Sequence, residues 1–128
     1  MDENDDSPLE QSSNECKYYA PDEFLSVING QTISLSSFHL NCRSLSSNWD
    51  AFLNLMCELQ NSEFSFDIIG LSEVFCADRD SRLVLPGYHN IITRCRDDGG
   101  RGGVGLFIRD TINYRVRTDL SVFIPHVY

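Results

Sequence analysis

The sequence lacks several features that would assign it to a familiar class. No apolar run approaches the roughly 20 residues of a membrane span. The opening residues, MDENDDSP, lack the basic and apolar regions of a secretory signal. Five cysteines form an odd set with no C-x-x-C pair, which argues against a disulfide framework or a zinc ribbon. We therefore expect no membrane partner, free and mostly buried thiols, and an intracellular location. The alternative, a metal site or an intermolecular disulfide, would involve Cys42 and Cys76.

Positive charge is also scarce. The formal net charge is −9, and Lys17 is the single lysine. Residues 1–30 carry eight acidic residues against that lysine, whereas residues 31–128 balance eleven acidic residues with nine arginines. An acidic chain is a poor non-specific ligand for polyanions, so DNA is expected to be at most a weak partner.

Composition divides the chain into three segments. Residues 1–15 are acidic and polar and are expected to form a disordered tail. Residues 16–30 form an N-terminal arm, in which Pro21 can start a short helix with Asp22 and Glu23 in its first turn. Residues 31–128 hold most of the apolar residues and are expected to be the folded domain.

Apolar periodicity predicts an α/β (α+β) fold with a mixed β-sheet and a β-α-β start. Thr32–Asn41 alternates as a strand, with a slip at Ser36-Ser37, and Phe66–Leu71 is a continuous apolar run typical of a buried strand. Between them, apolar residues recur at helical spacing from Trp49 to Leu59, and Ser47 is a suitable N-cap. The later segments predict an antiparallel hairpin and two further short strands: His89–Cys95 with Val104–Arg109, then Tyr114–Arg117 and Val122–Tyr128.

Polar side chains end both strands of the predicted parallel pair. Asn41 ends the first strand, and Glu73 follows the second. Parallel strands present their carboxyl ends at one sheet edge, where open α/β sheets place their sites. An amide oxygen and a carboxylate are hard ligands suited to Mg²⁺. The simpler interpretation, that Glu73 is a solvated residue or a helix cap, stays open.

Four stretches in order carry a family resemblance: SFHLNCRSL, DIIGLSEVF, LPGY and GGVGLFI. Together they resemble the N-terminal part of an endonuclease/exonuclease/phosphatase-superfamily domain, specifically the endonuclease of LINE-type non-LTR retrotransposons. KYYAPDEFL resembles the segment that precedes this domain, so the resemblance spans residues 16–128. It implies a four-layer α/β-sandwich of which this chain supplies one half. It also implies that Asn41 is the active-site asparagine and Glu73 the Mg²⁺ ligand.

The chain departs from the family in ways that bear on catalysis. Val74 stands where the family often has threonine, and the D-x-N and S-D-H tripeptides of the family's second half do not occur. Metal-assisted phosphodiester hydrolysis needs an activated water and several converging donors. His39, His89 and His126 are expected to be structural, and the glycines of GGRGGVGLFI to serve turns and close packing, because no Gly-Lys-Ser/Thr phosphate loop follows.

These observations predict a truncated, endonuclease-like domain of retrotransposon origin that is non-catalytic, binds Mg²⁺ weakly through vestigial Asn41 and Glu73, and self-associates. An exposed apolar sheet face would favour a homodimer. One alternative is a divalent-metal-dependent endonuclease assembled in an oligomer. Another is a nucleic-acid-binding module built on Tyr114 and a group of arginines: Arg94, Arg96, Arg101, Arg109, Arg115 and Arg117.

Overall fold

The structure is a computed structural model that describes residues 16–29, 33–75, 80–95 and 101–120. The chain divides into two compact units, Met1–Gln31 and Thr32–Tyr128. The division falls one residue from the expected start of the folded domain. The predicted acidic tail and the predicted strand at Val122–Tyr128 lie outside the described residues.

The described part of the first unit is organised around a short helix, α1 (Pro21–Ile28). Proline occupies its first turn, where a missing N–H costs nothing. The backbone N–H of Ala20 donates to the Glu23 carboxylate at 3.1 Å, and Phe24 N–H donates to the Ala20 carbonyl at 2.9 Å. The helix predicted to start at Pro21 is confirmed.

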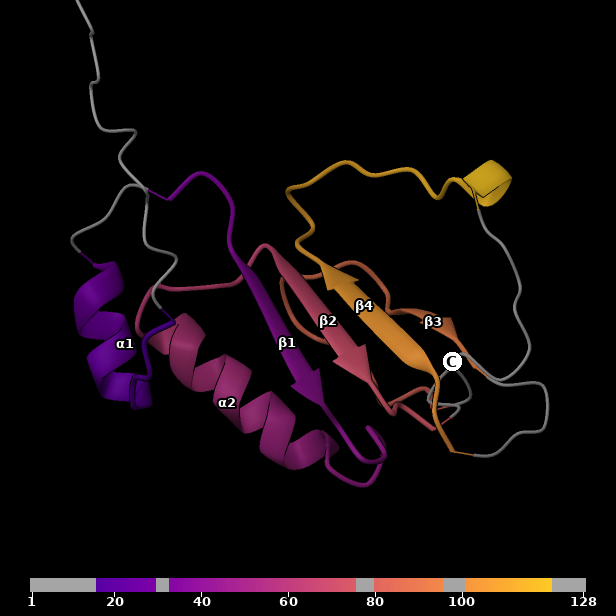
Figure 1. Cartoon of the computed structure of the whole chain (residues 1–128), viewed down its shortest axis with the longest axis horizontal. Coiled ribbons are helices and arrows are strands. Elements are labelled where there is room, and N and C mark those ends of the chain that lie inside the picture. Colours follow the sequence, from indigo (N-terminus) through magenta and orange to yellow (C-terminus); the bar gives the residue numbers. More distant parts are fainter. Residues whose placement is uncertain (1–15, 30–32, 76–79, 96–100, 121–128) are drawn as a thin grey trace, which may run out of the picture. The chain divides into compact units, whose positions relative to one another are not determined.

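The second unit is built on a four-stranded sheet with the order β1-β2-β4-β3 (Figure 1). Its strands are β1 (Ser37–Asn41), β2 (Ile68–Ser72), β3 (Ile92–Arg94) and β4 (Val104–Ile108). β1 and β2 are parallel, while β2 with β4 and β3 with β4 are antiparallel. The predicted α+β class, with a β-α-β start and an antiparallel hairpin, is therefore confirmed.

Two strand predictions were wrong in detail. β1 begins at Ser37 rather than Thr32, because the N–H of Ser36 donates to the Asp67 carboxylate at 2.8 Å. Tyr114–Arg117 forms no strand and leads instead into a short 3-10 turn, η2 (Thr118–Leu120). These residues are exposed, and alternation alone cannot supply the neighbouring strand that a ladder requires.

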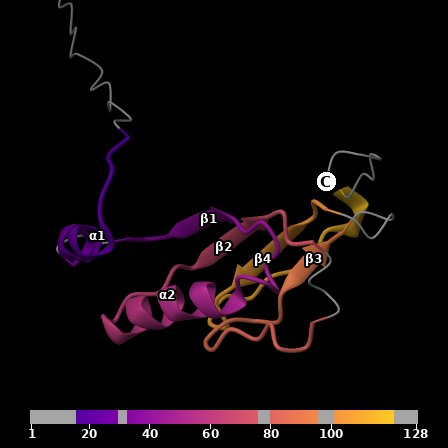
Figure 2. The same ribbon diagram turned by 90° about the horizontal axis from the view of Figure 1, so that it is seen from below.

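The helix α2 (Trp49–Asn61) connects β1 to β2 and covers one face of the sheet (Figure 2). Its buried residues, Trp49, Phe52, Met56 and Leu59, recur at helical spacing. The rings of Trp49 and Phe52 each lie 6.1 Å from the ring of Phe107 in β4, centroid to centroid. This aromatic cluster and the buried β2 residues Ile69 and Leu71 form the core.

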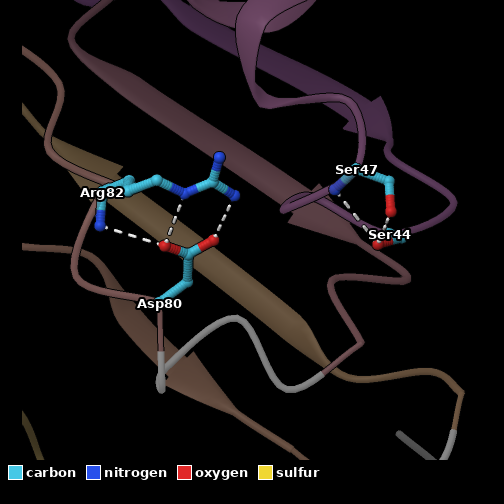
Figure 3. Close-up of polar contacts among 4 residues, drawn as sticks. All are labelled: Ser44, Ser47, Asp80 and Arg82. Carbon is cyan, nitrogen blue, oxygen red and sulfur yellow. Dashed lines mark hydrogen bonds and ion pairs between the residues drawn. The ribbon is translucent and has the colours of Figure 1, made fainter.

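The start of α2 differs from the predicted capping arrangement. Asn48, not Ser47, precedes the helix, and neither residue caps it through a side chain. Ser47 instead meets Ser44, with the two hydroxyl oxygens 2.9 Å apart (Figure 3). The predicted Ser47 cap is therefore wrong, because the Ser47 hydroxyl is hydrogen-bonded to Ser44 instead.

Near this loop, Arg82 Nη2 donates to the Asp80 carboxylate at 2.8 Å, and this hydrogen bond lowers the pKa of Asp80.

The other face of the sheet carries the alternate residues of all four strands. The side chains of these residues are exposed in β1, and most of them are half-buried in β2, β4 and β3. They form a face with apolar side chains across β2, β4 and β3 and polar side chains along β1: Ile68, Ile92, Val104 and Leu106, then Ser37, His39 and Asn41. We call this surface the open face.

Neither helix in the described part of the chain is long and apolar enough to cross a membrane.

Candidate functional site

β1 and β2 end side by side at one edge of the sheet (Figure 1). Asn41 lies directly opposite Ser72 in the parallel register, and Glu73 follows Ser72. The exposed Asn41 and the half-exposed Glu73 therefore lie on adjacent backbones at the carboxyl edge. This is the edge at which α/β sheets commonly bind their ligands.

The loops beyond these strands stay hydrogen-bonded to each other. Cys42 N–H donates to the Ser72 carbonyl at 2.9 Å, and Ser44 N–H donates to the Glu73 carbonyl at 2.9 Å. Arg43, Ser44, Glu73 and Phe75 all have positive φ, at 43°, 82°, 54° and 54°. Non-glycine residues rarely adopt this conformation, and it persists where the surroundings enforce it. The edge therefore holds four non-glycine residues in a strained backbone conformation.

Asn48 is the residue that holds the first of these loops. Its side-chain Nδ2 donates to the carbonyls of Cys42, Arg43 and Ser44 at 2.9, 3.2 and 3.2 Å. The sequence analysis missed this role, because it placed the helix cap at Ser47 and assigned none to Asn48. An asparagine before a helix would otherwise be interpreted as an N-cap. No local signal in the sequence distinguishes the two roles.

The Asn41 amide oxygen is already engaged. It accepts the backbone N–H of Arg43 at 3.3 Å, in a turn that the chain closes on itself. That oxygen is the one that the family resemblance would assign to the active site. Across the described ranges, no group of three or more His, Cys, Asp or Glu side chains is placed to hold a metal ion.

Val74 packs against the glycine loop that precedes β4. The Val74 side chain is fully buried, and its N–H donates to the Gly103 carbonyl at 3.3 Å. A Cβ on Gly103 would lie 3.2 Å from Val74 Cγ2, and one on Gly105 would lie 3.3 Å from Val74 Cγ1. Gly103 also has a φ of 82°. These two glycines thus serve turn geometry and close packing, as the sequence predicts. The Val74 side chain also has no hydrogen-bond donor that could hold the Glu73 carboxylate.

A second polar cluster, absent from the sequence predictions, lies at the opposite end of β2. The Asp67 carboxylate accepts the Ser36 N–H at 2.8 Å, the Ser36 hydroxyl at 3.2 Å and Arg109 Nη1 at 3.2 Å. Burial acts to raise the pKa of Asp67, but the hydrogen bonds from Ser36 and Arg109 outweigh it and lower the pKa. This cluster ties the segment before β1 to the residues that flank β2 and β4.

The other predicted site residues lie apart. His39 is exposed on the open face, and the His89 ring meets the Ile112 carbonyl at 2.9 Å, while His126 lies outside the described residues. Arg109 pairs with Asp67 and Arg117 with Asp119, so part of the proposed arginine group is already neutralised.

Cys16, Cys42 and Cys57 are free thiols. Cys42 is the one buried cysteine in the described part of the chain, so the expectation of mostly buried thiols is wrong. Burial raises the pKa of the Cys42 thiol to about 11. Cys76 lies outside the described residues.

Comparison with family models, with curated proteins and with solved structures gave no match to this chain.

Proposed function

We propose that residues 31–128 are an endonuclease-like segment of retrotransposon origin that does not hydrolyse phosphodiesters by itself and acts through self-association. The support is the ordered set of motifs that resembles the endonuclease family, together with a mixed sheet that starts with a β-α-β unit. Asn41 and Glu73 are the part of the family's catalytic set that the 128 residues contain. Loss of a general base alone typically reduces a rate by about 10²–10⁴.

The open face is the observation that supports self-association. α2 covers one side of the sheet. On the other side Val104 is 40% exposed, Leu106 and Ile92 are half-buried, and Ile108 at the end of β4 is buried. Val104, Leu106 and Ile92 lie next to each other across β4 and β3. A second copy of the chain can cover these residues in a two-fold symmetric contact, in which the same surface of both copies meets. Such a contact would remove the apolar side chains of this face from water.

Light scattering coupled to size-exclusion chromatography tests this proposal. The wild-type chain is expected to elute as a dimer at micromolar concentration, and Val104→Lys as a monomer, because it places two lysines and the two Arg94 side chains in one interface. Val84→Lys is the matched control, since Val84 is 62% exposed and lies in a loop outside the sheet. A wild-type monomer, or dimers that survive Val104→Lys with unchanged circular dichroism, would contradict the proposal.

A second candidate function is a divalent-metal nuclease assembled in the oligomer. The observation that favours it is the adjacency of Asn41 and Glu73 on strained backbone at the carboxyl edge. Mg²⁺ would be the metal implied, held through Glu73 with waters completing its shell. Plasmid nicking in Mg²⁺ or Mn²⁺ that disappears in Glu73→Ala but persists in Glu58→Ala would favour this function over the first. No nicking by the wild-type chain would exclude it.

DNA remains a weak partner in this proposal, because pairing of Arg109 and Arg117 with carboxylates reduces the free positive charge. We also propose an intracellular location, which the free thiols support.

A further inference from the structure

β1 has an unpaired backbone edge in the described part of the chain. It is the outermost strand of the order β1-β2-β4-β3. The Ser36 carbonyl accepts from Ile68 N–H, and Cys42 N–H donates to the Ser72 carbonyl, so the backbones of these even-numbered positions face β2. In a parallel strand the N–H and C=O groups of every second residue point to the same side. The N–H and C=O groups of Ser37, His39 and Asn41 therefore point away from β2. Such an edge is a template for a further strand.

An apolar pocket of about 370 Å³ opens beside this edge. Its wall of carbon atoms comes from the end of β1, the following loop and α2: Leu40, Cys42, Leu45, Ala51, Phe52 and Leu55. Phe38 and Leu40 face the same side of the sheet as α2, because they lie opposite the buried Ile69 and Leu71. A strand added to β1 would therefore direct alternate side chains toward this pocket.

The rest of the pocket lining is polar and includes one positively charged side chain. Asn41, Arg43 and Asn48 are its remaining lining residues, and none of the nine is acidic. Asn48 is committed to three backbone carbonyls. Among the residues that the structure describes, Arg43 is exposed and makes no ion pair. A carboxylate is the group that best complements an unpaired guanidinium at the end of an apolar pocket.

We propose that the β1 edge and this pocket bind an extended peptide with an apolar C-terminal side chain and a free C-terminal carboxylate. The peptide adds to β1 through the outward backbone groups, its last side chain enters the pocket, and its carboxylate meets Arg43. Because Arg43 follows the carboxyl end of β1, the added strand runs parallel to it. Backbone pairing would supply affinity and the pocket selectivity. The proposal uses the edge and the α2 side of β1, so it does not depend on the endonuclease resemblance or on the open face.

Fluorescence anisotropy with a fluorescein-labelled peptide, STVTVL, tests the proposal on the full chain. The same peptide with an amidated C-terminus is expected to bind about tenfold or more weakly, because a charge-assisted hydrogen bond is lost. Arg43→Gln should reduce binding of the free-carboxylate peptide by a similar factor and remove its preference over the amide. Arg115→Gln, the matched control for an exposed arginine outside the pocket, should leave binding unchanged.

A second pair of variants tests the pocket. Ala51→Trp fills it from an exposed position on α2 and should reduce affinity about tenfold, since an apolar side chain contributes roughly that much on burial. Asn54→Trp places the same ring on α2 outside the pocket and should bind as the wild type does. Val104→Lys on the open face should also retain binding, which separates this proposal from self-association.

Hydrogen exchange followed by NMR locates the contact. The amides of Ser37, His39 and Asn41 should exchange more slowly when STVTVL is added. The proposal is overturned if the peptide shows no saturable binding up to millimolar concentration, or if the carboxylate and amide forms bind alike. Protection of these amides that rises with protein concentration in the absence of peptide would also overturn it, because the edge would then pair with a second copy.

Discussion

Three glycines, two in the sheet and one in the loop before β4, allow a graded test of how tightly β4 packs against the carboxyl edge. An added Cβ on Gly103 would lie 3.1 Å from the backbone oxygen of Arg94, which cannot rotate away, and the φ of Gly103 is 82°. An added Cβ on Gly105 would meet two side-chain methyl groups, at 3.2 Å on Ile91 and 3.3 Å on Val74. At Gly70 the nearest atoms are 3.8 and 3.9 Å away, which is ordinary contact.

These distances predict the order in which three alanine variants lose free energy of unfolding. Gly103→Ala combines a left-handed conformation, about 1–2 kcal/mol, with overpacking, about 1–3 kcal/mol, so we expect a loss of roughly 2–5 kcal/mol in the free energy of unfolding. Gly105→Ala meets overpacking alone and should lose about 1–3 kcal/mol. Gly70→Ala should be neutral or stabilising by about 0.4–1 kcal/mol, because alanine restricts the unfolded chain.

Urea unfolding followed by tryptophan fluorescence measures this order. Trp49 is the single tryptophan and is 4% exposed in the core, so its emission reports on the sheet unit. With a slope of about 1–3 kcal/mol/M, a 2 kcal/mol loss lowers the midpoint by roughly 1 M. Equal midpoints for Gly70→Ala and Gly103→Ala would refute the reasoning.

A double-mutant cycle tests the cause. Val74→Ala should cost less in the Gly105→Ala background than in the wild type, with a coupling of about 0.5–3 kcal/mol. No coupling would mean that the close approach to Val74 does not determine the effect.

Two further predictions use the same unfolding assay. The lowered pKa of Asp67 means that its carboxylate contributes stability above its unfolded pKa, and that this contribution is lost as the pH falls through the lower folded pKa. The urea midpoint of the wild type should therefore fall between pH 5 and pH 2 more steeply than that of Asp67→Asn; equal slopes would contradict the prediction. Asn48→Ala should lower the midpoint by the equivalent of about 1–3 kcal/mol, because it leaves the strained loop after β1 without its hydrogen-bond donor. Asn54→Ala, an exposed control within α2, should have almost no effect, and an equal loss in both variants would contradict a specific role for the Asn48 hydrogen bonds.

The sequence allowed the β-α-β start to be predicted because each part of it has a local signature. Helical spacing from Trp49 to Leu59 and the apolar run at Phe66–Leu71 both follow from burial. The pairing of β1 with β2 then follows from the short helical crossover between them. The same logic misled at Tyr114–Arg117, where alternation exists but no neighbouring strand pairs with it in the described chain.

The polar clusters could not be predicted, because their members are distant in sequence. Asp67 meets Ser36 across 31 positions and Arg109 across 42. Nothing near Asp67 in the chain indicates that a strand end will bring a serine and an arginine to it. The placement of Asn41 and Glu73 on one edge was predictable from parallel pairing, whereas the capture of the Asn41 oxygen by Arg43 N–H was not.

Because its residues alternate between two faces of the sheet, β1 can take part both in the proposed dimer contact and in the proposed peptide site. Phe38 and Leu40 face α2 and define the side of the sheet on which the pocket lies. Ser37 and His39 place their side chains on the open face, and Asn41, at the end of the strand, also lines the pocket. The outward backbone groups belong to the second set, so an added strand would use the backbone of residues whose side chains border the proposed dimer contact. Because side chains and backbone project in perpendicular directions, a second copy on the open face and a peptide on the edge can bind the same strand without competing for the same atoms.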